Sequence, residues 1–83
     1  MTLSITTHYK IWNDEDGFYH RINGPALIGY NGDKHWYVHG KCHRLDGPAR
    51  EIDNQKQWFY KGDLIDCNTQ EEFERIIKLK LLW

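Results

Sequence analysis

The chain lacks the features that mark several large classes of protein. It has two cysteines in 83 residues, Cys42 and Cys67, too few for the disulfide framework of a small secreted domain. We expect two free thiols, with a Cys42–Cys67 disulfide as the alternative. No apolar stretch approaches the roughly 20 residues of a membrane span, and residues 1–8 lack the basic and then apolar run of a signal peptide. A reduced, intracellular protein is expected.

An excess of charge of one sign is also missing. The chain carries 11 basic and 12 acidic residues, for a net charge of −1. This balance supplies no positive field to hold a phosphate backbone, so it does not favour nucleic acid as a partner. The length suits a single domain, 1–83, and a domain of this size buries only about 60% of its unfolded surface. Four Trp, five Tyr and three Phe compensate, because each buried aromatic ring removes roughly 150–250 Å² from water.

What the chain does contain is a repeated heptapeptide. His20-Arg21-Ile22-Asn23-Gly24-Pro25-Ala26 recurs as His43-Arg44-Leu45-Asp46-Gly47-Pro48-Ala49. An aromatic run and a glycine follow each copy, at residues 36–40 and 58–62. The histidines are 23 residues apart but the tryptophans Trp36 and Trp58 are 22 apart, so the second copy is one residue shorter in the loop 53–55. Such a repeat predicts an array of similar structural units.

Local sequence chemistry predicts that each unit is built from hairpins. Asn23-Gly24-Pro25 and Asp46-Gly47-Pro48 should form sharp corners, since the glycine is free to take a positive φ and the proline has a fixed φ. Strands are expected at 26–28 and 49–52, with return strands at 36–38 and 57–60. Asn31-Gly32 is the strongest signal for a type I′ turn, and further turns are expected at His39-Gly40 and Lys61-Gly62.

The predicted fold class is mainly β (α+β), an antiparallel β-hairpin repeat meander closed by one C-terminal α-helix. Residues 1–19 are interpreted as a degenerate N-terminal unit whose first 12 residues form a half-exposed strand, residues 20–42 as the first repeat and residues 43–66 as the second. The helix is expected at 69–82. Thr69 and Glu72 fit a capping box at its start, and Phe73, Ile76 and Ile77 form the face that should pack on the meander.

The last helical turn does not follow that face. Leu79, Leu81, Leu82 and Trp83 point in widely separated directions at 100° per residue, so one sheet surface cannot cover them all. Two interpretations stay open. The four residues form an exposed interface for a partner protein or a second copy, or Trp83 folds back into the core.

We predict no catalytic or metal site, although His35 and His39 have the H-x₃₋₅-H spacing of a zinc ligand pair. His20-Arg21 and His43-Arg44 recur in step with the corners, which favours structural roles such as an imidazole bonded to a turn carbonyl and a guanidinium bonded to a carboxylate. His35 and His39 would lie about 13 Å apart on one strand, and the acidic run 13–17 lacks the spaced ligands of an EF-hand. We therefore predict no enzyme, no catalytic residue, no metal and no cofactor.

Residues 20–62 resemble a short repeat, W-Y-x-x-G-x-x-H-R-x-D-G-P-A, that occurs in small proteins of T-even-like tailed bacteriophages and some giant viruses and is distantly akin to MORN-type β-hairpin repeats. Residues 36–49 match the motif throughout, whereas Asn23 stands where the motif has Asp. Residues 65–75 and 78–83 are similar to the closing segment of such phage proteins. The resemblance implies a phage-encoded accessory protein in the host cytoplasm and carries no catalytic residue.

Two function hypotheses follow. The first is a binding protein that docks on a host protein, for example a defence protein, and modulates or inhibits it, with Leu79, Leu81, Leu82 and Trp83 as an interface that also predicts a homo-oligomer. The alternative is a small-ligand or nucleotide sponge assembled between protomers, in which aromatic faces stack a base and an arginine holds a phosphate. Its candidate contacts are Arg21, Arg44, Trp36 and Trp58.

Overall fold

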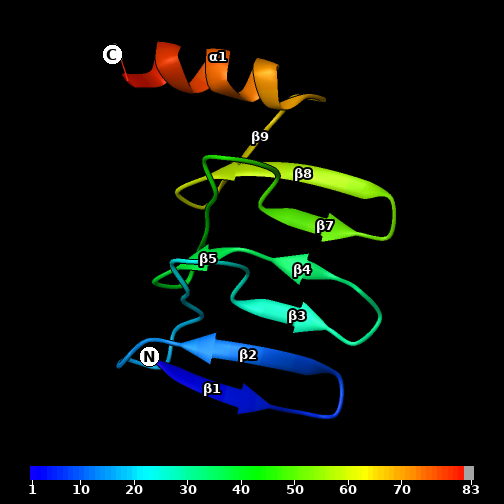
Figure 1. Ribbon diagram of the computed structural model, residues 1–83. Helices are drawn as coiled ribbons and strands as arrows, with labels where there is room; N and C mark the ends of the chain where they lie inside the picture. The colour runs from blue at the N-terminus through cyan, green and yellow to red at the C-terminus, as the bar shows by residue number, and fades with distance from the viewer. Residues whose placement is uncertain (82–83) are drawn as a thin grey trace.

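The computed structural model describes residues 1–81 as a stack of β-hairpins with a helix across the C-terminal end (Figure 1). In chain order the elements are β1 (Thr2–Ile5), β2 (Tyr9–Asn13), β3 (Leu27–Gly29), β4 (Lys34–His35), β5 (Tyr37–Val38), β6 (Lys41–Cys42), β7 (Arg50–Ile52), β8 (Gln55–Tyr60), β9 (Asp63–Ile65) and α1 (Gln70–Leu81). The predicted fold class, an antiparallel meander closed by one helix, is confirmed. Across residues 1–81, no helix has the length and apolar character to cross a membrane.

Seven strands form one sheet in the order β1-β2-β3-β4-β7-β8-β9, while β5 and β6 form a separate two-stranded ribbon. Every pairing is antiparallel. Trp36 alone separates β4 from β5, so the aromatic strand leaves the sheet there and turns into the ribbon. Each repeat thus has a hairpin in the sheet at one end and a corner at the other, and the corners form one side of the array.

The shorter second copy appears in the structure as a shorter loop. Four residues, 30–33, lie between β3 and β4, whereas two residues, Asp53 and Asn54, lie between β7 and β8. The Gly29 amide donates to the Asp33 carbonyl at 2.8 Å, so the part of the first loop outside the strand pairing is the three residues 30–32. The type I′ prediction at Asn31-Gly32 is wrong, because Gly32 has a positive φ of 99° and Asn31 does not. The Asn31 side chain instead accepts a hydrogen bond from the Asp33 amide at 3.2 Å, which stabilises a three-residue loop.

Two-residue turns with the type I′ pattern occur at the other end of each repeat. His39 and Gly40 have φ values of 48° and 81°, and Lys61 and Gly62 have values of 49° and 91°. A type I′ turn needs positive φ at both central residues. Histidine adopts a positive φ more often than most non-glycine residues, whereas lysine is an uncommon choice. A hydrogen bond to the motif histidine of the same repeat holds each residue in place, as described below.

The N-terminal segment contains two strands where one half-exposed strand was predicted. β1 and β2 pair from Thr2 with Asn13 to Ile5 with Lys10. Thr6 makes the turn between them, because its hydroxyl oxygen accepts the Tyr9 amide at 3.0 Å. A threonine side chain that bonds backbone in this way is a weak turn signal, so the sequence alone does not distinguish the two strands from one.

The helix begins as the capping box predicts and buries the predicted face. The Thr69 hydroxyl accepts the Glu72 amide at 3.1 Å, although the Glu72 carboxylate reaches the Asn68 amide and the Thr69 hydroxyl instead of the Thr69 amide. Phe73 is 1% exposed and clusters with Trp58, Ile65 and Ile77. The largest apolar cluster therefore lies where α1 covers the last hairpin.

Both cysteines are free thiols. Cys42 is buried in β6, where its thiol lies 3.8 Å from the Ala49 carbonyl. Burial raises the pKa of Cys42 to about 11. The thiol therefore stays protonated at neutral pH and contributes as a small apolar side chain.

Candidate functional site

Each heptapeptide corner is built on an arginine stacked over a tryptophan. The Arg21 guanidinium carbon lies 3.9 Å from the centroid of Trp12, and Arg44 lies 3.9 Å from the centroid of Trp36. One guanidinium nitrogen then donates to a proline carbonyl, that of Pro25 at 3.2 Å or that of Pro48 at 3.0 Å. The stack ties each corner to the aromatic segment of the preceding unit, and the hydrogen bond to the proline carbonyl closes the corner on itself.

The corner glycines are required for space. Neither Gly24 nor Gly47 has a positive φ, so the predicted reason for glycine is wrong. A Cβ atom at Gly47 would lie 2.6 Å from the guanidinium carbon of Arg44, and one at Gly24 would lie 3.1 Å from that of Arg21. Each guanidinium is therefore held between a tryptophan ring and a bare glycine backbone.

Each motif histidine bonds the two-residue turn at the end of its own repeat. His20 Nδ1 accepts the backbone amide of His39 at 3.0 Å, and His43 Nδ1 accepts that of Lys61 at 2.9 Å. Both imidazoles therefore bond a turn amide, where the prediction named a turn carbonyl. An accepting Nδ1 carries no proton, so each ring is in the neutral form with its proton on Nε2. Burial, followed by the nearby Lys61 charge, lowers the pKa of His43, which favours that form.

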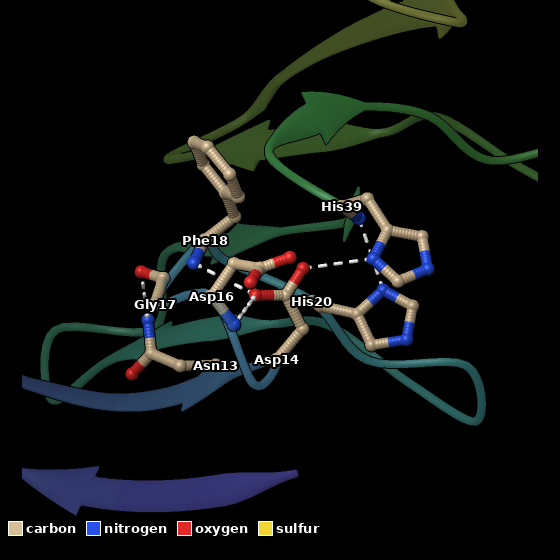
Figure 2. A network of polar contacts seen from close by, with 7 residues as sticks. All are labelled: Asn13, Asp14, Asp16, Gly17, Phe18, His20 and His39. Carbon is tan, nitrogen blue, oxygen red and sulfur yellow. Dashed lines mark hydrogen bonds and ion pairs between the residues drawn. The ribbon is translucent and has the colours of Figure 1, made fainter.

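A network of Asp14, His39 and His20 extends the first of these connections (Figure 2). Asp14 Oδ1 accepts the amides of Asp16 and Phe18 at 3.0 and 2.9 Å, and Asp14 Oδ2 lies 2.8 Å from His39 Nδ1. The hydrogen bond from the His39 side chain lowers the pKa of Asp14. The rings of His39 and His20 stack with centroids 4.0 Å apart.

The network contains a carboxylate hydrogen-bonded to a histidine, a pair that also occurs in catalytic sites. Here the pair connects two neighbouring units. With Nδ1 bonded to Asp14, the exposed Nε2 of His39 could act as a base, yet in residues 1–81 no Ser, Thr or Cys side chain is hydrogen-bonded to either ring. Stacked rings also direct their outer nitrogens side by side, whereas the ligands of one ion converge on it. Among the described residues no group of three His, Cys, Asp or Glu side chains could hold a metal ion.

An open groove of about 660 Å³ lies between the two corners. Arg21, Arg44 and Trp36, three of the four predicted ligand contacts, line this groove. Trp58 does not, because it is 5% exposed and its indole nitrogen donates to Gln70 at 2.8 Å. The groove wall also contains the fourth residue of each corner and the apolar third residue, Ile22 or Leu45.

The predicted C-terminal interface lies away from the groove. Leu79 and Leu81 are 56% and 67% exposed on the last turn of α1, so these two side chains are not covered by the sheet. Leu82 and Trp83 lie outside the described residues.

Sequence reasoning missed the Asp14–His39 pair altogether. The two residues are 25 apart in the chain, and they lie in different units, so no local spacing connects them.

Comparisons with protein-family models, with curated proteins and with solved structures find no match to this chain. The resemblance to the phage repeat therefore stays a prediction from the motif.

The glycine contact predicts a specific pattern of coupling. Gly47→Ala should lower the free energy of unfolding by about 1–2 kcal/mol, because the new methyl group displaces the guanidinium from Trp36 and from its hydrogen bonds. In an Arg44→Ala background the same change should be neutral or stabilise the fold by roughly 0.4–1 kcal/mol, since alanine restricts the unfolded chain more than glycine does. Urea denaturation of the four variants measures this coupling. Equal costs in both backgrounds would contradict the stacked corner.

The His43 connection predicts that stability falls in mild acid. The pKa of His43 is lowered in the folded state from its ordinary value of 6.5, so below that pH the unfolded chain binds a proton more readily than the folded chain. The free energy of unfolding should therefore decrease as the pH falls through 6.5. His43→Asn removes this titration, and chemical denaturation across the pH range should show a shallower decrease for the variant. Parallel profiles for the two proteins would contradict the prediction.

Proposed function

We propose that this protein is a binding module that docks on another protein through the corner side of its array. The observation that carries the proposal is that most residues of each heptapeptide make internal contacts, while one exposes an apolar side chain. The histidine, arginine, glycine and proline of each corner make contacts inside the protein, whereas the third residue points an apolar side chain to solvent. Ile22 is 69% exposed and Leu45 is 56% exposed.

These two apolar side chains repeat at equivalent positions on the corner side of the array. Ile22 and Leu45 occupy equivalent positions of neighbouring units, and both line the groove between the corners. Exposed apolar residues that flank a groove on a small protein are a common mark of a protein-binding surface. The motif resemblance adds the setting that we propose, a phage protein in the host cytoplasm that modulates or inhibits a host protein.

The alternative of a nucleotide sponge has weaker support. Base stacking requires a free aromatic face, but Arg21 covers one face of Trp12, Arg44 covers one face of Trp36, and Trp58 is buried. The arginines remain as phosphate contacts without a clear platform for the base.

Crosslinking in phage-infected host cells tests the docking proposal. Epitope-tagged wild type should enrich a defined host protein, and the Ile22→Ser/Leu45→Ser variant should lose that enrichment because the groove loses its apolar rim. Tyr30→Ser serves as the matched control, since Tyr30 is an exposed large side chain on the loop between β3 and β4. Equal enrichment by the wild type and the double variant would contradict the proposal.

We also propose that the last turn of α1 associates with a second copy, because Leu79 and Leu81 are exposed next to the core-facing side of the helix. Leu79→Ser/Leu81→Ser should shift sedimentation from an oligomer toward a monomer with little loss of stability, since neither side chain is buried. A wild-type monomer at all concentrations would contradict this second surface.

A further inference from the structure

The two corners differ at one position that changes the charge of the groove. In the second corner, Arg44 Nε donates to Asp46 Oδ1 at 2.9 Å, so the positive charge is paired. Asn23 occupies the equivalent position of the first corner, and its amide carries no charge to balance Arg21. Among the described residues, the difference between Asn23 and Asp46 therefore leaves Arg21 without a paired carboxylate, whereas Arg44 has one.

In the part of the chain that the structure describes, the Nε donor of Arg21 is free, whereas the equivalent donor of Arg44 bonds Asp46. Its Nη1 donates to the Pro25 carbonyl, and within residues 1–81 no carboxylate or other protein acceptor takes the protons of Nε or Nη2. Because a guanidinium presents its donors in a planar fork, the two remaining nitrogens suit a carboxylate that approaches from the groove. Trp12 and the Gly24 backbone hold that fork in place.

Apart from the polar side chains of Asn23 and His43, the rest of the groove wall is apolar or contains the paired Arg44 and Asp46. Ile22 and Leu45 form exposed rims, Trp36 and Val38 lie between the corners, and the second guanidinium is paired with Asp46. Equivalent positions of the two units are two strands apart, or about 10 Å, which matches three residues of an extended peptide. The wall thus offers one free positive charge next to apolar contacts at peptide spacing.

We propose that this groove binds an acidic and apolar peptide segment of the partner protein. A carboxylate of the partner pairs with Nε and Nη2 of Arg21, and neighbouring apolar side chains of the partner pack against Ile22 and Leu45. The assignment rests on the proposed protein-binding function and adds to it the site and the chemistry of the partner. A peptide fits the groove better than a nucleotide does, because the rims are aliphatic and the stacked arginines already cover tryptophan faces.

The chain itself supplies the decisive substitution. Asn23→Asp places in the first corner the residue that the second corner already has at that position, so the fold should tolerate it while Arg21 becomes paired. The probe is a yeast-displayed library of random peptides sorted against wild-type protein. The enriched peptides should carry Asp or Glu beside apolar residues, and Asn23→Asp should weaken their binding by about tenfold or more.

Matched variants separate charge at the site from charge in general. Asn54→Asp makes the same change of net charge on the exposed loop between β7 and β8 and should leave binding unchanged. Asp46→Asn frees a second guanidinium and should not weaken binding. Affinity of the wild type should also fall with added salt, since the pair at the groove is partly exposed.

Several outcomes would overturn the assignment. These are enrichment of basic or uncharged peptides, full binding by Asn23→Asp, or loss of binding in Asp46→Asn. Saturable binding of ATP or inorganic phosphate that Asn23→Asp abolishes, with no peptide enriched, would assign the site to a phosphate instead. If Ile22→Ser/Leu45→Ser abolishes capture of the host protein while Asn23→Asp does not, the carboxylate site is wrong and the protein-binding function stands.

Discussion

The stack of an arginine between a tryptophan ring and a bare glycine is the contact on which the array depends. It joins the corner of each unit to the strand that precedes it, and it explains why the heptapeptide keeps Arg, Gly and Pro together. The stack positions the proline carbonyl as an acceptor and the following alanine in the interior, where Ala26 and Ala49 are 0% exposed. A methyl group at the glycine would displace the guanidinium from the stack, and a side chain larger than a methyl group at the alanine would not fit its buried position.

The array ends where a different residue meets the third tryptophan. Trp58 occupies the position of Trp12 and Trp36, but no arginine follows it eight or nine residues later, as Arg44 and Arg21 follow the other two. Gln70 at the start of α1 takes that place, because its side chain accepts the Trp58 indole proton and donates to the Leu45 carbonyl, both at 2.8 Å. The helix thereby closes the last unit with an amide, and Phe73 and Ile77 supply the buried area that a further hairpin would otherwise provide.

Repetition and variation have separate roles in this chain. The repeated residues form the contacts within and between units, which leaves the surface to the residues that differ or that face outward. Ile22 and Leu45 share a position and an exposed apolar character, whereas Asn23 and Asp46 share a position and differ in charge. This arrangement leaves two positions per corner whose side chains can differ without loss of the contacts that hold the fold.

The sequence by itself determined the repeat, the hairpins, the shortened second loop and the buried face of α1, because turns and periodic faces depend on residues close together in the chain. It misplaced the type I′ turn and misread the corner glycines, since both depend on contacts from residues outside the turn. Only the tertiary structure shows that Asp14 lies next to His39. It also shows that Arg21, Trp36 and Arg44 line one groove, whereas Trp58 is buried outside it. Those arrangements depend on distances between units, and no spacing within a single unit specifies them.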